Sequence, residues 1–309
     1  MEFTHKPVLL AECIEALHIR PEGIYVDGTL GRAGHSREIA QRLTTGRLVC
    51  IDRDQAAIDA AQERLGEWMD RVTLVHSNFD RVSEILDELG ISGVDGMLFD
   101  LGVSSPQLDD GSRGFSYMQD APLDMRMSQQ GETAADLVNT ASREEISRIL
   151  RDYGEEPYAW QIAGRIVEAR ETAPIETTLQ LADIVAGAMP PAERRKNKNP
   201  SRRTFQALRI AVNHELDALE EGLDTIFDHL APGGRLCVIT FHSLEDRLVK
   251  NKFRRWSTAC TCPPEFPVCV CGGKAKAKLI TRKPIEADKQ ELEENRRSRS
   301  AHLRVLEKL

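Results

Sequence analysis

The first third of the chain alternates short apolar runs with segments that repeat apolar residues at helical spacing. The apolar runs typical of buried strands are residues 24–26, 47–51, 72–75 and 96–99. The segment after the second run places Ile58, Ala61 and Leu65 on one face of a helix, with Asp54 as its expected N-cap. This order predicts a mainly parallel sheet of the α/β class, whose ligand lies at the carboxyl ends of the strands.

The alternation stops between residues 109 and 203, where helical patches occur without a strand-like run. One patch begins with Ser142 and Glu145 at the spacing of a capping box. Later, a long amphipathic helix leads to Pro232-Gly233-Gly234, which is expected to end it, and then to a strand over residues 235–241. The pattern predicts one α/β domain that a helical insertion interrupts.

The expected boundaries follow from these changes of pattern. We assign residues 1–109 and 204–309 to the α/β domain and residues 110–203 to the inserted helical domain. A length of 309 residues fits a main domain of about 200 residues with an additional one. Residues 278–281 and 301–306 are expected to form a closing pair of strands.

Composition narrows the class of protein. The formal net charge of −8 argues against non-specific coating of nucleic acid, so any such contact must come from local basic patches. No apolar run approaches the roughly 20 residues that span a bilayer, and the N-terminal residues do not resemble a secretory signal. Seven cysteines, an odd number, are typical of reduced thiols. We therefore expect a cytoplasmic protein without a membrane partner.

A glycine-studded turn follows the first strand. Asp27 ends that strand, and Gly28, Gly31 and Gly34 fall three residues apart before a helix begins. Glycines let the backbone approach a ligand closely, and N–H groups at a helix start favour an anionic group. The spacing is not the G-x-G-x-x-G dinucleotide fingerprint. The turn is a candidate cofactor cradle, and a glycine-rich connection without a ligand is the alternative.

Three further strand ends carry side chains with binding chemistry. Asp52 stands where an acid of a nucleoside-binding sheet accepts hydrogen bonds from ribose hydroxyls, although acids at such places also cap helices. Phe79 is placed either to stack on a purine or to pack in the core. Asp100 opens a cluster of glycine and small polar residues typical of the lip of a site. We expect these strand ends to converge on one crevice.

Longer motifs carry a resemblance to one family. They are residues 27–36 (DGTLGRAGHS), 100–109 (DLGVSSPQLD), 113–116 (RGFS), 122–127 (PLDMRM), 203–209 (RTFQALR), 241–247 (FHSLEDR) and 295–304. Over nearly its whole length the chain resembles the bacterial 16S ribosomal RNA cytosine-N4 methyltransferases, the RsmH (MraW) family. The resemblance implies a class I, S-adenosylmethionine-dependent, Rossmann-like fold with an inserted helical substrate-recognition domain. The implied reaction methylates N4 of a cytosine in the decoding centre of the small ribosomal subunit.

The same resemblance implies a set of methyl-donor contacts. Carried over residue by residue, they are Ala33, Gly34, His35, Asp52, Phe79, Asp100 and Gln107. Ala33 stands where the family more usually has glycine, so its methyl group is tolerated if its φ is negative. Arg296 and His302 also depart from frequent family residues, and we expect these two departures to be neutral.

The reaction itself requires little acid–base chemistry. The sulfonium methyl is already activated, so the enzyme must chiefly hold the cytosine amine in line with it. Acceptors that orient the amine hydrogens should help, and the candidates are Ser105, His242 and Asp246. His242 and Asp246 have an equal alternative role as buried structural partners. The Asp/Asn-Pro-Pro-aromatic motif of many amino-methyltransferases is absent after the fourth strand.

Basic residues and cysteines are concentrated in two parts of the sequence. Residues 194–203 contain a basic run, and a second group comprises Lys274, Lys276, Lys278, Arg282 and Lys283. Both groups suit an RNA phosphate backbone, with solvated loops as the alternative. The residues Cys260, Cys262, Cys269 and Cys271 form two C-x-C pairs that could close a structural zinc site or remain unligated thiols.

Three other functions compete with this interpretation. A DNA amino-methyltransferase would be expected to carry the missing Pro-Pro-aromatic motif. A nicotinamide oxidoreductase would be expected to carry G-x-G-x-x-G. A non-enzymatic ribosome-assembly factor would bind RNA and the methyl donor without transferring the methyl group. The sequence leaves the oligomeric state and the form of the RNA substrate open.

Overall fold

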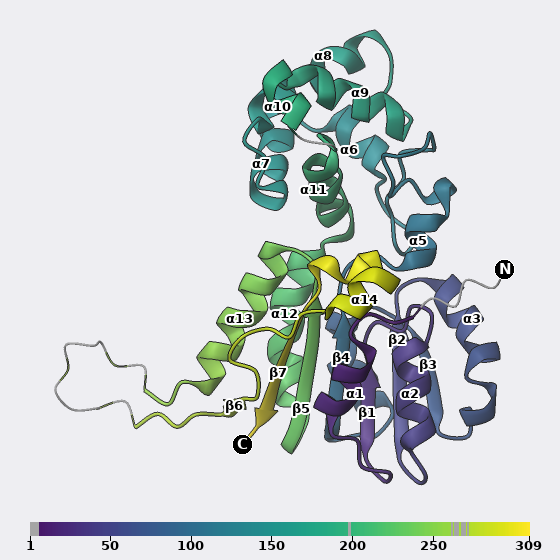
Figure 1. Ribbon diagram of the computed structural model, residues 1–309, viewed down its shortest axis with the longest axis vertical. Helices are drawn as coiled ribbons and strands as arrows, with labels where there is room; N and C mark the ends of the chain where they lie inside the picture. Colours follow the sequence, from purple (N-terminus) through teal and green to yellow (C-terminus); the bar gives the residue numbers. More distant parts are fainter. Residues whose placement is uncertain (1–5, 197–198, 261, 263–265, 267–269, 271) are drawn as a thin grey trace. The chain divides into compact units, whose positions relative to one another are not determined.

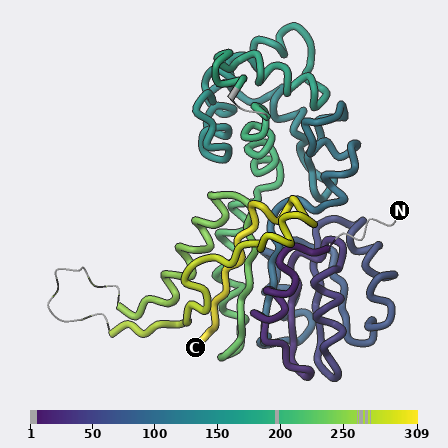
Figure 2. Tube along the Cα trace, in the orientation of Figure 1, coloured from purple at the N-terminus to yellow at the C-terminus, as the bar shows by residue number. Residues whose placement is uncertain are grey.

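The computed structural model describes residues 6–196, 199–260, 262, 266, 270 and 272–309. The chain forms two compact units (Figure 1). The α/β unit comprises Met1–Gly102 and Leu216–Leu309, and the inserted unit comprises Val103–Glu215. Figure 2 traces the chain from its purple N-terminal part, through the teal inserted unit, to its yellow C-terminal part.

Seven strands of the described chain form one sheet in the α/β unit, in the order β3-β2-β1-β4-β5-β7-β6. They are β1 (Ile24–Asp27), β2 (Arg47–Asp52), β3 (Val72–His76), β4 (Val94–Asp100), β5 (Leu230–Thr240), β6 (Ala277–Leu279) and β7 (His302–Lys308). Neighbours from β3 to β5 pair in parallel, whereas β7 is antiparallel to β5 and β6. The fold is the predicted Rossmann-like α/β class, and the expected closing pair is confirmed as β6 and β7.

Strand β5 begins earlier than the sequence predicted. Its first pair joins Leu230 to Val94 and the next joins Arg235 to Gly96, so the register shifts between them. The segment Pro232-Gly233-Gly234 lies inside the strand, and Gly233 has a φ of 79°. The prediction that the strand starts only after these residues was wrong, because an irregular stretch of the strand absorbs them.

Helices cover both faces of this sheet. Those of the α/β unit are α1 (Leu10–Leu17), α2 (Gly34–Arg42), α3 (Gln55–Arg64), α4 (Val82–Glu88), α12 (Glu215–Asp228), α13 (Ser243–Ser257) and α14 (Lys289–Glu294). Along β2, Leu48 and Cys50 pack in the cluster that contains α1, α2 and α3. Val49 and Ile51 pack in the opposite cluster, with α4, α12 and α13. Because successive side chains point to opposite faces, this apolar run is buried on both sides.

The inserted unit is helical in its described part. Its helices are α5 (Ser105–Asp109), α6 (Ala134–Thr140), α7 (Arg143–Gly154), α8 (Ala159–Thr172), α9 (Thr178–Ala188), α10 (Pro191–Lys196) and α11 (Arg202–Asn213). They share a separate core that includes Ile162, Leu181 and Phe205. One isolated bridge joins Pro122 to Thr177. In the parts of the chain that are described, no helix combines the length and the apolar character needed to cross a membrane.

The inserted unit is longer than the expected range of 110–203. The sequence assigned α11 to the α/β domain, but its residues Phe205, Ala207 and Leu208 are buried in the core of the inserted unit. Periodicity shows that a helix has an apolar face, but not which core that face joins. The division between the units therefore falls after Gly102 and after Glu215.

Candidate functional site

The loop between β1 and α2 approaches the sheet most closely at Gly28. A β-carbon added there would lie 2.1 Å from Cε1 of Phe99, so the neighbouring aromatic ring requires glycine. Ala33 ends the loop with a φ of 59° and is buried. The condition of a negative φ is therefore not met. Its methyl group stands in the left-handed region, at a cost of about 1–2 kcal/mol.

The two titratable groups that flank this loop are buried. The carboxylate of Asp27 accepts hydrogen bonds from the Ser36 hydroxyl at 2.5 Å and from the Thr29 N–H at 3.1 Å. Burial raises the pKa of Asp27 to about 6, against the opposing effect of these hydrogen bonds. His35 Nε2 lies 3.0 Å from the Val8 carbonyl oxygen. Burial lowers the pKa of His35 to about 4, so its ring is neutral at pH 7.

Asp52 holds the turn after β2 together. Its two carboxylate oxygens accept the N–H groups of Gly31 and Asp54, both at 2.8 Å. Burial raises the pKa of Asp52, and these hydrogen bonds oppose the rise. The N-cap of α3 is Asp54, whose side chain accepts the Ala56 N–H at 3.2 Å, as the sequence predicted. Asp52 is therefore not the helix cap, and each of its oxygens retains a lone pair for a further donor.

Phe79 lies at the start of a short 3₁₀ helix, Phe79–Arg81, after β3. Its ring meets Phe99 edge-on, with 5.7 Å between the centroids. It packs against the core on the α4 side of the sheet but is only partly buried. The structure thus gives Phe79 a core contact and leaves part of the ring accessible, which is compatible with both roles that the sequence suggested.

Asp100 ends β4 with a buried carboxyl group. Its Oδ1 has no hydrogen-bond partner within the described residues, and its N–H donates to Thr29 Oγ1 at 2.6 Å. Burial raises the pKa of Asp100 to about 8, and the charges of Asp27 and Glu245 add to the rise. The ends of β1, β4 and β5 therefore bring carboxyl groups close enough to influence one another.

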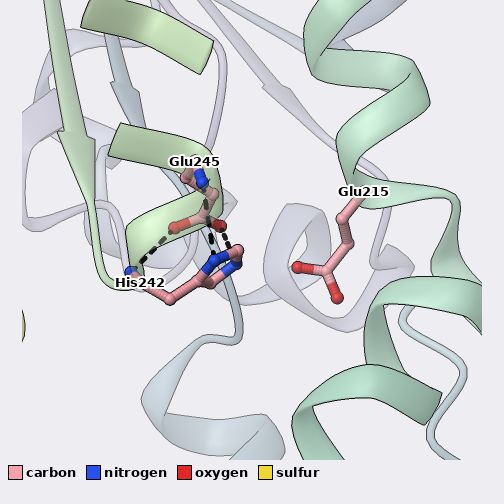
Figure 3. A group of neighbouring side chains, drawn as sticks. All are labelled: Glu215, His242 and Glu245. Atoms are coloured by element: carbon pink, nitrogen blue, oxygen red, sulfur yellow. Dashed lines mark hydrogen bonds and ion pairs between the residues drawn. The ribbon is translucent and has the colours of Figure 1, made fainter. Parts of the chain in front are cut away.

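The turn between β5 and α13 is held by His242 and Glu245 (Figure 3). His242 is the N-cap of α13, and its Nδ1 accepts the Glu245 N–H at 3.5 Å. Glu245 Oε2 accepts the N–H groups of Phe241 and His242 at 2.9 and 3.3 Å. His242 Nε2 lies 3.0 Å from Glu245 Oε1. Glu245 was not among the predicted site residues, although its position three residues after a helix-capping residue is the signal of a capping box.

Asp246 is bound to the last strand. Its carboxylate accepts two hydrogen bonds from Arg304, at 2.7 and 2.9 Å. Burial alone would raise the pKa of Asp246, but the hydrogen bonds and charge of Arg304 outweigh it and lower the pKa. Both Asp246 and His242 thus have structural partners, which is the alternative role that the sequence allowed them.

The remaining predicted residues lie in the inserted unit. Ser105 and Gln107 belong to α5, where Gln107 is buried and its Oε1 accepts the Ser104 N–H at 3.0 Å.

Glu215, also drawn in Figure 3, is the last residue of the inserted unit. Its carboxylate accepts two hydrogen bonds from Arg209, at 2.8 and 2.9 Å.

Comparison with known proteins places the chain in a family. The model of the MraW methylase family matches residues 2–309. The chain belongs to the MraW methylase family. A protein named ribosomal RNA small subunit methyltransferase H, from Lachnospira eligens, is 58% identical over 100% of this chain and 99% of that protein. A protein of the same name from Brevibacillus brevis is 56% identical with the same coverage.

Among solved structures, an rRNA methylase from Streptococcus thermophilus matches this MraW-family chain with a TM-score of 0.44. It is 11% identical and the match covers 99% of each chain. A likeness this distant carries no argument about function. The family membership thus rests on the sequence match, and the predicted family resemblance is confirmed.

Three groups of exposed basic residues lie on this methylase. Arg194 and Arg195 of α10 form no side-chain hydrogen bond or ion pair with any described residue, whereas Lys198 lies outside the described residues. The second predicted group, Lys274 to Lys283, has exposed basic side chains. A third group was missed: Arg247, Lys250 and Arg254 are exposed on α13. Their spacing of three and four residues, which places them along one helix face, was the available signal.

Two of the four cysteines of the predicted zinc site, Cys260 and Cys262, lie among the described residues. Cys260 is exposed and Cys262 is partly buried, and neither forms a disulfide. Cys269 and Cys271 lie outside the described residues. The zinc site therefore stays a prediction from the sequence.

Proposed function

We propose that this MraW-family methylase transfers a methyl group from S-adenosylmethionine to N4 of a cytosine in the decoding centre of 16S ribosomal RNA. The observation that carries the proposal is identity of 52–58% with six relatives named ribosomal RNA small subunit methyltransferase H or H 2, over 99–100% of the chain. The cytosine-N4 target and the decoding centre come from the motif resemblance. The small ribosomal subunit is the proposed partner, in the cytoplasm.

The proposed methyl-donor contacts in the α/β unit are Ala33, Gly34, His35, Asp52, Phe79 and Asp100, and Gln107 is the proposed contact from the inserted unit. Asp52 would accept hydrogen bonds from the ribose hydroxyls through the carboxylate lone pairs that its two hydrogen bonds to backbone N–H groups do not use. The accessible part of Phe79 would stack on the adenine. The buried carboxyls at the ends of β1 and β4 suit a cationic ligand, because an opposite charge favours their ionised form.

S-adenosylmethionine, when bound, supplies a methyl group that needs no further activation. The residues of the chain then have to exclude water, orient the donor and hold the cytosine amine in line with the methyl carbon. Neutral His35 adds no positive charge beside a cationic donor. We retain Ser105, His242 and Asp246 as candidate acceptors for the amine hydrogens. Asp246 is hydrogen-bonded to Arg304, and His242 lies in contact with Glu245. Either residue would have to keep this contact while it accepts a hydrogen from the cytosine amine.

The exposed basic groups are the proposed RNA contacts. Arginine and lysine side chains without acidic partners can neutralise phosphates and release counterions. Arg194 and Arg195 place such charges on the inserted unit, and Arg247, Lys250 and Arg254 add exposed basic side chains on the α/β unit. This supports binding of RNA by a chain whose net charge is −8.

The decisive experiment combines the protein, isotopically labelled S-adenosylmethionine and small ribosomal subunits that lack base methylation. We expect label on one cytosine, at N4, located by nuclease mapping and mass spectrometry. Protein-free 16S RNA and DNA serve as comparison substrates. Label on DNA would support the amino-methyltransferase alternative, and donor binding without transfer would support an assembly factor.

We also propose a structural zinc ion at Cys260, Cys262, Cys269 and Cys271, because four thiolates can complete a tetrahedral zinc site. Elemental analysis of protein purified without chelator should find about one zinc per chain, and Cys269→Ser should lower that content. Metal-free protein with unchanged folding would leave four unligated thiols.

A further inference from the structure

We propose that Arg143 and Trp160 form a stacking platform for one unpaired base of the RNA substrate. The proposal rests on the proposed function, which makes RNA the substrate, and adds a contact that lies in the inserted unit. The two residues stand at the starts of the neighbouring helices α7 and α8. We call this pair the Arg–Trp platform.

The indole of Trp160 is exposed in a way that other aromatic rings of its unit are not. Its exposed fraction is 48%, whereas Phe115 and Phe205 are buried and the three tyrosines of the unit are at least partly buried. About half of the Trp160 side chain is therefore accessible to a partner that can stack on an aromatic ring.

The guanidinium group of Arg143 lies over the indole ring of Trp160. The guanidinium carbon lies 4.0 Å from the ring centroid, which is the geometry of a cation–π contact. One terminal nitrogen of Arg143 also donates to the Trp160 carbonyl oxygen at 3.3 Å. A β-carbon added at Gly164 would lie 2.8–3.1 Å from three atoms of the guanidinium group. Glycine at 164 thus leaves the space that lets the guanidinium lie flat along α8.

The charge of this arrangement is not compensated locally. Arg143 forms no ion pair with an acid in the described part of the chain, and its Nε is buried without a hydrogen-bond partner. The nearby acid Glu145 is directed to Arg148, at 3.9 Å. An arginine without an acid beside an exposed indole combines attraction for phosphate with a stacking surface.

A nucleotide of a single strand satisfies both features. Its base can stack on the accessible indole surface, and its phosphate can approach the uncompensated guanidinium. A paired base in a duplex cannot do this, because its faces are already stacked. The platform is therefore expected to distinguish an unpaired strand from a duplex and to tolerate any base.

Tryptophan fluorescence offers a direct test with the full chain and without methyl donor. The chain has three tryptophans. Trp68 provides the matched control, because Arg37 lies over its ring at 5.7 Å but the ring packs against the core of the α/β unit. Titration with a short single-stranded RNA should quench the wild-type and Trp68→Phe proteins, and quenching should be lost in Trp160→Phe.

Affinity measurements identify the group that is bound. Trp160→Ala should bind the strand about tenfold or more weakly, the effect of losing one base–aromatic stack. The same variant should bind an abasic strand of equal length as tightly as wild type. Arg143→Gln should reduce the salt dependence of binding by about 0.7 in the logarithmic slope, the share of one phosphate.

The platform would be overturned if Trp160→Phe were quenched as fully as wild type, or if Trp160→Ala lost equal affinity for both strands. A third outcome would also overturn it: RNA causes no quenching, and Trp160→Ala weakens only the binding of a small-subunit protein in the absence of RNA. The surface would then bind a protein and not an unpaired base. Circular dichroism of Trp160→Phe should match wild type, which separates loss of the contact from loss of folding. Quenching without methyl transfer would contradict the proposed function but support the Arg–Trp platform. Methyl transfer without quenching would support the proposed function but contradict the platform.

Discussion

Asp27 and the Oδ1 atom of Asp100 are buried at strand ends of the α/β unit, and no described Lys or Arg side chain pairs with either residue. In the inserted unit, by contrast, Asp124 is paired with Arg126. Two hydrogen bonds join the side chains of that pair, at 2.9 and 2.7 Å, and the Arg126 backbone N–H donates a third to Asp124 at 2.9 Å. Burial raises the pKa values of Asp27 and Asp100, to about 6 and about 8. For Asp124, burial also acts to raise the pKa, but Arg126 outweighs it and lowers the pKa.

This difference separates two uses of acidic side chains, and the α/β unit contains both, because its Asp246 is paired with Arg304. In the inserted unit, an acid is neutralised by a neighbour and contributes to the fold. In the α/β unit, burial without a cation costs stability, because a carboxylate loses its hydration and gains no opposite charge. A cationic ligand would supply that charge, which agrees with the proposed methyl donor.

The largest expected effect is the change in stability, and in its pH dependence, that Asp100→Asn produces. The folded-state pKa of about 8 lies above the unfolded value near 4, so the folded state holds an extra proton between them. Wild-type stability should therefore fall as pH rises from about 4 to about 8. The variant should lack this component and gain several kcal/mol at pH 8, since one pKa unit corresponds to about 1.4 kcal/mol.

Urea unfolding of both proteins at pH 5 and pH 8 measures this effect, and calorimetry should show that the stabilised variant binds S-adenosylmethionine more weakly. A remaining slope between pH 4 and 6 is expected from Asp27. Identical pH dependence of the variant and wild type would show that Asp100 does not titrate in this range.

A smaller effect, a loss of stability, is expected for Asn213→Ala in the inserted unit. Asn213 Oδ1 accepts the Met127 N–H at 2.8 Å, and its Nδ2 donates to the Met125 carbonyl oxygen at 2.7 Å. Each buried group left without a partner costs about 1–3 kcal/mol. Urea unfolding should show this loss of stability.

The control is Asp124→Asn, which should cost at most about 1 kcal/mol because its ion pair is partly exposed. Neither variant should change methyl-donor affinity if the inserted unit uses these groups only for folding. A loss of donor affinity in Asn213→Ala with unchanged stability would contradict the comparison between the units.

Asp52→Ala should weaken methyl-donor binding by about 2–3 kcal/mol, the value of hydrogen bonds to a charged acceptor. The loop also loses the acceptor for the Gly31 N–H. Asp54→Ala is the matched control, because it removes the N-cap of α3 at a cost of about 1 kcal/mol of stability and leaves donor affinity unchanged. Equal donor affinities of wild type and Asp52→Ala in calorimetry would refute the ribose assignment.

The smallest expected effect per residue concerns the basic run of the inserted unit. Replacing Arg194, Arg195, Lys196 and Lys198 by Ser should lower RNA affinity and flatten its salt dependence, by about 0.7–0.9 in the logarithmic slope for each lost phosphate contact. Methyl-donor affinity should not change. Filter binding at several salt concentrations measures the slope, and an unchanged slope would assign the run to a solvated loop.

Sequence patterns of short range determined much of this protein. The strand run 47–51 is apolar at every central position because both faces of β2 are buried. Asp54 caps α3 and Ser142 caps α7, and each bond spans only two or three residues. Such features were predictable because the interacting atoms lie within one helical turn.

The tertiary structure alone decided how distant segments meet. Asn213 bonds to Met127 across 86 residues, and no local pattern marks that pairing. The membership of α11 in the inserted core, the early start of β5 and the left-handed φ of Ala33 likewise depend on packing partners elsewhere in the chain. The sequence by itself determined the elements and the acids at their ends, because local periodicity encodes them. Burial and the absence of a neighbouring cation, which raise the pKa of Asp100, follow only from the folded arrangement of the sheet.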